Sequence, residues 1–294
     1  MPLMKSETTL AHNWRFDALG TSWEIASGVP IGDATKKRVT KQLALFELTF
    51  SRFIGDSFVS VIADKPGSYT FPSDAKEIFS LYEELYELTD GKVTPLVGEA
   101  LADAGYDARY SLQSKKEIHP VPRYGEVVQR KGNVITTNQP VMFDVGAVGK
   151  GYAVDTIIEL LKADGYSSFV VDASGDMRIV GDTTQQVGLE NPHNFEEVIG
   201  TVDLHNKALC ASASNRRKWG EWHHIIDPNT ASPTHEIIAT WVVADSAMVA
   251  DGLATALFFT SPETLRAKYT YEYMRMHADG SVEYSDYFAK GIFE

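Results

Sequence analysis

Apolar residues recur every three or four positions in several long stretches of the chain, a spacing that places them on one face of a helix. An Asp-Gly pair follows two of these stretches, at residues 90–91 and 164–165, and is a typical helix stop signal. Asp245 or Ser246 stands where it can cap the last stretch. The predicted helices span residues 36–50, 74–89, 152–161 and about 247–259.

Shorter stretches rich in β-forming residues lie between the helices and predict strands and hairpins. The predicted strands cover residues 14–26, 168–172, 177–180, 269–276 and 281–284, with hairpins in 105–141 and an antiparallel meander in 200–244. Because the strands are interspersed with separate helices and do not alternate regularly with them, the pattern favours an α+β fold. We expect mixed, largely antiparallel sheets with packed helices, in two intimately associated lobes of a single domain over residues 1–294.

The composition is that of a globular protein with a substantial core, since 44% of the 294 residues are hydrophobic and 23% are charged. The formal net charge of −13 argues against a nucleic-acid surface, which needs basic side chains to neutralise phosphates. An anionic ligand would need local positive potential from a helix N-terminus, a lysine or a cation. No long apolar run and no apolar leader segment occur, so we expect no membrane insertion and a cytoplasmic location.

A stretch of small residues precedes the third predicted helix, in the sequence DVGAVGKGYAVD at residues 144–155. Its glycines would let the backbone approach a ligand closely, and the helix N-terminus together with Lys150 would favour an anion. The spacing is neither that of a P-loop nor that of a dinucleotide-binding fingerprint. A phosphate cradle and a purely structural glycine turn are therefore both open.

Asp251 and Thr255 lie four residues apart on the last predicted helix, which places both oxygens on one face about one turn apart. Oxygen ligands of this kind suit Mg²⁺, which completes its shell with water and substrate phosphate. The alternative is a surface Asp beside a Thr that bonds back to its own turn. The apolar neighbours of Asp251 favour the metal, because an unpaired buried carboxylate is costly.

His224 lies in the segment WHHIIDP, which predicts an apolar strand with His223 on the opposite face. A single histidine is more often structural than catalytic, so the segment alone leaves both roles open. The two histidines do not make a zinc motif, because alternating faces cannot ligate one ion. The basic residues at 216–218 are more simply solvated charges, although they are the nearest basic cluster to His224.

Taken in order, these motifs resemble the ApbE-like FAD:protein FMN transferase family across nearly the whole chain. The matching segments are LGT (19–21), SRFIGDS (51–57), TDGKVTPLVG (89–98), DVGAVGKGYAVD (144–155), DASGD (172–176), ALCASAS (208–214), HIIDP (224–228) and SAMVADGLATALF (246–258). The resemblance implies an ApbE-like, T-fold-like architecture. It also implies Mg²⁺-dependent transfer of FMN from FAD to a Ser or Thr hydroxyl of an acceptor flavoprotein, with release of AMP.

The resemblance assigns roles to particular residues. It implies that Mg²⁺ is held by the Ala147 carbonyl, Asp251 and Thr255. The positions that correspond to FAD contacts are Leu19, Phe53, Val93, Thr94, Asp144, Lys150 and Ile226.

The acceptor hydroxyl needs a proton acceptor, and His224 is our candidate because the ordinary pKa of histidine lies near working pH. Asp251 is the rival base, although Mg²⁺ ligation would lower its basicity. Two other functions remain open: a metal-dependent FAD pyrophosphatase that gives FMN and AMP, and a non-catalytic FAD-binding carrier.

Overall fold

An antiparallel sheet forms the centre of the protein, whose computed structural model describes residues 10–293. It has eight strands in the order β1-β2-β6-β7-β10-β15-β16-β17, and every neighbouring pair is antiparallel. The strands are β1 (His12–Ala18), β2 (Thr21–Ser27), β6 (Phe169–Asp172), β7 (Asp176–Val180), β10 (Ala208–Ala213), β15 (Ile237–Ala244), β16 (Glu272–His277) and β17 (Val282–Tyr284). The predicted α+β class with mainly antiparallel sheets is confirmed.

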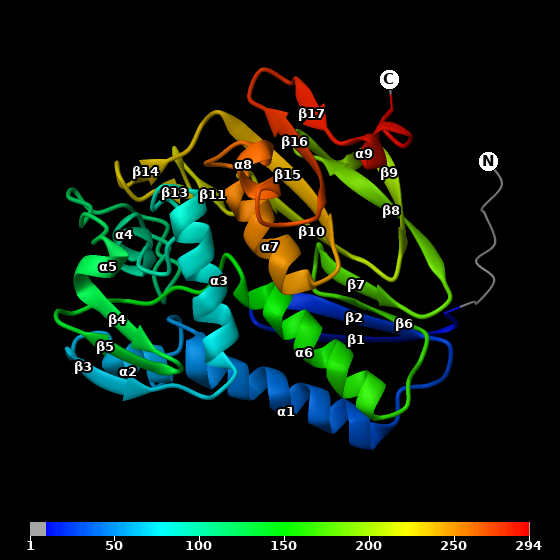
Figure 1. The fold of residues 1–294 in the computed structure, drawn as a ribbon, viewed down its shortest axis with the longest axis horizontal. Coiled ribbons are helices and arrows are strands. Elements are labelled where there is room, and N and C mark those ends of the chain that lie inside the picture. Colours follow the sequence, from blue (N-terminus) through cyan, green and yellow to red (C-terminus); the bar gives the residue numbers. More distant parts are fainter. Residues whose placement is uncertain (1–9, 294) are drawn as a thin grey trace.

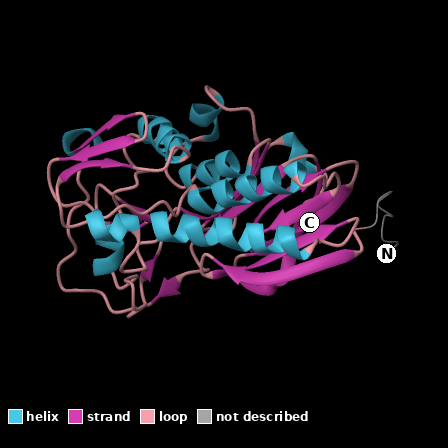
Figure 2. Ribbon diagram, turned by 90° about the horizontal axis from the view of Figure 1, so that it is seen from below, coloured by secondary structure: helices cyan, strands magenta, loops and turns pink. Residues whose placement is uncertain are grey.

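Helices cover one face of this sheet, as Figures 1 and 2 show. They are α1 (Asp33–Phe50), α3 (Ala75–Leu88), α6 (Gly149–Ala163) and α7 (Ala247–Ala256). Helices α6 and α7 pack on each other and on β7, while α1 packs on α6 and α3 packs on α7. The largest hydrophobic cluster fills this layer, where Trp23 and Ile25 of β2 are fully buried with Val154 and Ile158 of α6.

A long ribbon covers the opposite face of the sheet, formed by β8 (Thr184–Asn191) and β9 (Asn194–His205) together with α9 (Asp286–Ala289). A second hydrophobic cluster lies here and joins Leu189 and Leu204 of the ribbon to Trp241 and Val243 of β15. Val242, between these two β15 residues, belongs to the first cluster. Strand β15 is buried on both faces because it is covered on both, and its sequence is accordingly apolar except for Thr240, whose hydroxyl donates to the Ala254 carbonyl oxygen.

Smaller elements surround the end of the sheet where the loops gather. They are α2 (Phe58–Ile62), β3 (Gly67–Thr70), α4 (Gly98–Asp103), α5 (Tyr124–Val127), β4 (Val128–Lys131), β5 (Val134–Thr137), β11 (Lys218–Trp219), β12 (Trp222–His223), β13 (Ile226–Asp227), β14 (Ser232–Pro233) and α8 (Pro262–Arg266). Strands β3, β5 and β4 form a sheet of their own.

Three sequence-based predictions of secondary structure need correction. The segment 200–244 is not one meander, because β9 pairs with β8, β10 and β15 join the central sheet, and β11–β12 and β13–β14 form two small hairpins. The single strand predicted over residues 14–26 is a hairpin, because the chain turns at Leu19 and Gly20, both of which have positive φ. In the region 105–141 only β4 and β5 form a hairpin, and residues 105–123 carry neither helix nor strand. The predicted long helices are present, and Ser246 is the cap of α7 because its Oγ accepts from the Val249 N–H.

None of the described helices is long and apolar enough to cross a bilayer. The first nine residues, on which the expectation of a cytoplasmic location partly rests, lie outside the described residues.

Candidate functional site

A cavity of about 1110 Å³ opens where the first turn of α6 meets Asp251 and Thr255 of α7, the loops around α4 and the β11–β13 region. Every residue that the sequence singled out for a role lines it, although these residues are spread over most of the chain. They are Leu19, Phe53, Val93, Thr94, Asp144, Ala147, Lys150, His224, Ile226, Asp251 and Thr255. The fold therefore brings all of the candidate site residues to one place.

Asp251 reaches the cavity because α7 lies directly against the start of α6. Its Oδ2 accepts a hydrogen bond of 2.9 Å from the Gly151 N–H. A Cβ added to Gly151 would lie 2.2 Å from the Ala247 carbonyl oxygen and 2.8 Å from the Asp251 Cβ. Gly151 is thus required by the close approach of the two helices, which is the structural alternative that the sequence left open for this glycine.

Asp251 is buried, with a relative exposure of 5%. Burial, and then the nearby Asp176 carboxylate, raise the pKa of Asp251 well above its ordinary value. Thr255 follows one turn later on the same helix and also lines the cavity. The predicted placement of both oxygens on one face of α7 is therefore compatible with a cation, whose charge would oppose this rise in pKa.

The turn that carries Ala147 is held by a buried tyrosine. The Tyr82 hydroxyl donates to the Asp144 carbonyl oxygen at 3.2 Å and accepts from the Ala147 N–H at 3.3 Å. This contact fixes the backbone just before α6, and Tyr82 and Ala147 both line the cavity. The described residues contain no cluster of three or more His, Cys, Asp or Glu side chains suited to a metal.

Lys150 is not a free cation, because its Nζ lies 2.8 Å from Oδ2 of Asp176. Burial lowers the pKa of Lys150, but the carboxylates of Asp176 and Asp251 outweigh it and leave that pKa raised. Asp176 is fully buried, and its Oδ1 has no hydrogen-bond partner among the described residues. Asp176 is the last residue of the motif DASGD, and no local pattern in the sequence indicated a role for it.

Asp144 is likewise engaged within the protein, by Arg52 and by its own turn. The Arg52 Nε donates to Oδ2 at 2.5 Å, and the Gly146 N–H donates to Oδ1 at 2.7 Å. Burial would raise the pKa of Asp144, but the Arg52 guanidinium and these hydrogen bonds hold it below its ordinary value. Arg52 also donates to the Tyr106 carbonyl oxygen at 2.7 Å, and its Nη2 is buried without a partner among the described residues.

Aromatic side chains form one wall of the cavity, and the sequence indicated only Phe53 among them. Phe53 stacks on Tyr110 with ring centroids 5.2 Å apart and meets the edge of Tyr106 at the same centroid distance. Tyr106 in turn stacks on Trp219 at 5.7 Å. The Arg52 guanidinium lies 4.3 Å from the centroid of Phe53. Three of these rings lie in loops or a two-residue strand, where no periodic pattern marks them.

His224 differs from its prediction in two respects. Strand β12 ends at His223, so His224 follows the strand and does not lie in it. The Nε2 of His223 lies 2.8 Å from the Thr234 carbonyl oxygen, whereas His224 lines the cavity. Burial, and then the charge of Arg217, lower the pKa of His224 to about 3. The pKa of His224 in the folded protein thus lies below the ordinary value that suggested it as a base. The ring is neutral, with its Nδ1 unpartnered among the described residues.

The basic residues at 216–218 are exposed to solvent, as predicted, and they also line the cavity. Arg216 pairs with Glu190 of β8, and its guanidinium lies 5.2 Å from the ring centroid of Phe195. Arg217 acts electrostatically on His224 and on Tyr106. These side chains supply local positive charge in a protein whose net charge is −13.

Comparison with known proteins decides the family. A sequence model of the ApbE family matches residues 19–276. The chain belongs to the ApbE family. Its relatives include the FAD:protein FMN transferase of Escherichia coli (strain K12), 28% identical over 83% of this chain and 77% of that protein. The one from Vibrio cholerae is 24% identical over 79% of this chain and 72% of its own length.

The match to a third ApbE relative is shorter. A Rhodobacter capsulatus FAD:protein FMN transferase is 28% identical over 60% of this chain, and the matched part is 36% of that protein's length. Among solved structures, the flavin transferase ApbE from Vibrio cholerae superposes with a TM-score of 0.80 at 19% identity, covering 97% of this chain and 99% of that one. The ApbE protein from Thermotoga maritima gives 0.81 at 23% identity, covering 96% and 99%. These structures establish that the fold is that of the ApbE family.

Proposed function

We propose that this protein transfers FMN from FAD to a Ser or Thr hydroxyl of an acceptor flavoprotein and releases AMP. The observation that carries the proposal is the convergence in one cavity of all the residues that the family resemblance singles out. The FAD:protein FMN transferase activity that its relatives are named for supports the same conclusion.

The chemistry of the cavity is suited to a flavin dinucleotide. Its volume of about 1110 Å³ lies at the upper end of the range typical of small-molecule sites. The stacked rings of Phe53, Tyr110 and Tyr106 offer flat apolar faces to a planar ring system. Lys150 and Arg217 offer positive charge to a pyrophosphate. Each of these features serves a different part of FAD.

The residues present also fit the Mg²⁺ ion that the family resemblance implies. The Ala147 carbonyl, the Asp251 carboxylate and the Thr255 hydroxyl are the hard oxygen donors that Mg²⁺ prefers, and all three residues line the cavity. The buried Asp251 forms no ion pair among the described residues, whereas Lys150 pairs with Asp176. When bound there, Mg²⁺ would offset the negative charge of the pyrophosphate.

In the proposed reaction the acceptor hydroxyl oxygen attacks the phosphorus of the FMN half. A new P–O ester bond forms, the anhydride P–O bond breaks, and AMP leaves with the electron pair. His224 accepts the hydroxyl proton in this proposal, because it lines the cavity and its Nδ1 is unpartnered among the described residues. Its pKa of about 3 makes it a weak base in the free protein, so Asp251, whose pKa is raised by burial, remains the rival base.

Product analysis tests the proposal against its alternatives. The protein is incubated with FAD, Mg²⁺ and flavoprotein candidates from the same genome, and flavin is followed by in-gel fluorescence while AMP is quantified. Flavin covalently attached to an acceptor, with equimolar AMP, supports transfer. Free FMN and AMP without labelled protein would instead establish a pyrophosphatase, and unchanged FAD would establish a carrier.

The proposal extends to the domain organisation and the location of the protein. The chain acts as a single domain over residues 1–294, and the family match over residues 19–276 supports this. Its two intimately associated lobes would correspond to the hydrophobic clusters on the two faces of the central sheet. A cytoplasmic location is proposed from the sequence alone.

A further inference from the structure

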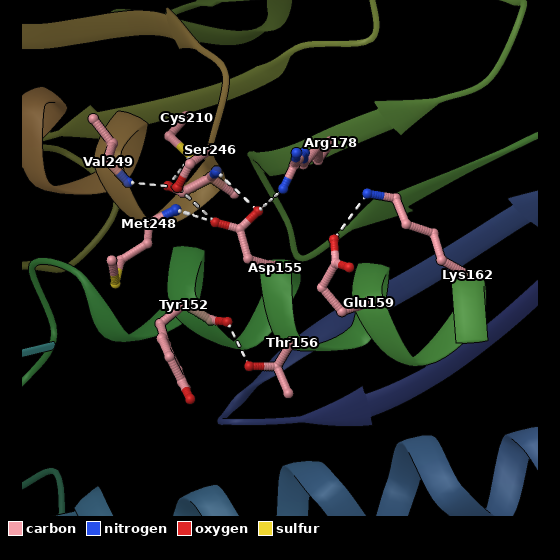
Figure 3. Close-up of polar contacts among 11 residues, drawn as sticks. Tyr152, Asp155, Thr156, Glu159, Lys162, Arg178, Cys210, Ser246, Met248 and Val249 are labelled. Atoms are coloured by element: carbon pink, nitrogen blue, oxygen red, sulfur yellow. Dashed lines mark hydrogen bonds and ion pairs between the residues drawn. The ribbon is translucent and has the colours of Figure 1, made fainter. Parts of the chain in front are cut away.

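Asp155 connects the helix that begins at the cavity with the helix that carries the proposed metal ligands (Figure 3). Its Oδ2 accepts from the Ser246 Oγ at 2.7 Å and from the Met248 N–H at 2.9 Å. Its Oδ1 accepts from the Ala247 N–H at 3.1 Å and from Arg178 at 2.6 Å. Both carboxylate oxygens are therefore fully used, and most of their partners belong to the N-terminus of α7.

These contacts provide hydrogen-bond acceptors for more of the N–H groups at the start of α7 than a cap residue alone could. The first N–H groups of a helix have no partner within the helix and carry partial positive charge. Asp155 accepts hydrogen bonds from two of these N–H groups, and the Ser246 Oγ accepts one from a third, the Val249 N–H. Arg178 balances the charge of the carboxylate. The N-terminus of α7 is thus fixed to α6.

A second contact between the two helices lies one turn earlier on α6, at Gly151. Residues 151 and 155 share a face of α6 and are about 6 Å apart along its axis. The Gly151 N–H donates a hydrogen bond to the Asp251 carboxylate, while Asp155 accepts hydrogen bonds from the first residues of the same helix α7. Two attachment points constrain both the position of α7 along α6 and its rotation about its own axis.

The proposed metal ligands come from both of these elements. Ala147 lies just before α6, whereas Asp251 and Thr255 lie on α7. Mg²⁺ demands near-ideal octahedral geometry at about 2.0–2.1 Å, so small changes in the relative position of its ligands cost affinity. Asp155 is not part of the cavity lining within the described residues, so any effect it has on the metal must pass through α7.

We propose that Asp155 is a positioning residue that sets α7 so that Asp251 and Thr255 meet the Ala147 carbonyl around Mg²⁺. This inference rests on the proposed function, and specifically on its metal site. It assigns a role to the last residue of the motif DVGAVGKGYAVD, for which the sequence offered none. Outer partners of metal ligands typically change metal affinity by about 10- to 100-fold when mutated.

The test compares Asp155→Asn with a matched change at the other end of the same helix, Asp164→Asn. Asp164 resembles Asp155 in its partners, because it accepts from the Thr35 Oγ at 2.7 Å and from Arg38. Its side chain is also similarly exposed, 15% against 19%. Asp164, however, fastens α6 to α1 and not to α7.

Two quantities are measured for each variant: the Mg²⁺ concentration for half-maximal FAD turnover, and the Mg²⁺ concentration that gives half of the metal-induced rise in Tm. For Asp155→Asn we expect both to rise about 10- to 100-fold, with FAD affinity in the absence of Mg²⁺ unchanged. For Asp164→Asn we expect a lowered Tm but an unchanged Mg²⁺ requirement. Equal shifts in the two variants, or none in Asp155→Asn, would overturn the inference.

Ser246→Ala provides a second variant should Asp155→Asn fail to fold, because it keeps the carboxylate and removes one hydrogen bond to Asp155 together with the cap bond from the Val249 N–H. A smaller shift in the same direction supports the inference, and an unchanged Mg²⁺ requirement contradicts it. Measurements on the wild-type protein distinguish a failure of the metal site from a failure of the role of Asp155. Wild-type flavinylation that depends on Mg²⁺, combined with unshifted variants, would refute the role of Asp155 alone. Flavinylation that needs no Mg²⁺ would refute the metal site and this inference together.

Discussion

The ammonium group of Lys150 lies 2.8 Å from a carboxylate oxygen of Asp176, and this ion pair joins the start of α6 to the start of β7. Lys150 lines the cavity, whereas Asp176 is fully buried. The positive charge that the sequence predicted for phosphate binding is therefore held in place by a carboxylate that the sequence did not single out.

Replacing Lys150 by Ala should weaken the binding of FAD much more than the binding of riboflavin, because riboflavin has no phosphate to contact. Calorimetric titration of both ligands checks this. Lys162→Ala, on the last turn of the same helix and exposed to solvent, is the control and should leave both affinities unchanged. Equal losses for the two ligands in Lys150→Ala would place Lys150 away from the phosphates.

The same substitution leaves Asp176 buried without its partner, so Lys150→Ala should also lower the free energy of unfolding by about 3 kcal/mol. Adding Asp176→Asn removes the uncompensated charge and should restore most of this loss. Denaturant unfolding of both single variants and the double variant measures the coupling. Purely additive effects would show that the ion pair contributes nothing to stability.

Asp251→Ala should abolish Mg²⁺-dependent turnover while the protein remains folded, because it removes the only carboxylate among the proposed metal ligands. Thr255→Ser keeps a hydroxyl at the second position and should retain activity, whereas Thr255→Val should raise the Mg²⁺ requirement. Turnover at limiting Mg²⁺ is measured, with circular dichroism as the check on folding. Full activity of folded Asp251→Ala would remove this metal site.

His224→Ala should retain FAD binding but lose about 10² to 10⁴ in the rate of transfer, the usual cost of removing a general base. A base acts on the acceptor hydroxyl and contributes little to holding the donor. Single-turnover flavinylation and FAD titration measure the two effects separately. Near-normal flavinylation with normal FAD affinity would leave Asp251 as the proton acceptor.

The lowered pKa of His224 also predicts how the free energy of unfolding depends on pH. Its folded pKa of about 3 lies below the ordinary value near 6.5, so folding favours the neutral ring. The stability it contributes is fully present above about pH 6.5 and is lost as the pH falls toward 3. His224→Gln should therefore lose less stability than the wild type between these pH values in denaturant unfolding. Parallel curves for the two proteins would contradict the burial of a neutral His224.

Gly151→Ala should destabilise the protein by about 1–3 kcal/mol, because its Cβ would collide with the Ala247 carbonyl oxygen. Gly125→Ala is the control, since a Cβ there meets no atom within 4 Å. Thermal unfolding measures both variants. If Gly151→Ala were as stable as Gly125→Ala, the two helices would not be in the close contact described.

The sequence by itself determined the features that depend on residues close together along the chain. The spacing of apolar residues in α1, α3 and α6 predicted these helices, and Ser246 was correctly indicated as a cap for α7, because periodicity and capping act within a few residues. The order of the motifs identified the family and with it a set of residues that lie around one cavity. The pattern of β-forming residues did not reveal the turn at Leu19 and Gly20, because such residues continue on both sides of the turn.

Only the tertiary structure decided which charges meet and which groups are buried. Arg52 and Asp144 are 92 residues apart in sequence, and no local pattern relates them. The pairing of Lys150 with Asp176 and the fastening of α7 by Asp155 likewise depend on how the helices pack on the sheet. The pKa of His224 falls to about 3 because neighbouring segments exclude water from its ring. Burial is a property of the assembled chain, so the residue types at a site could be read from the sequence while their protonation and partners could not.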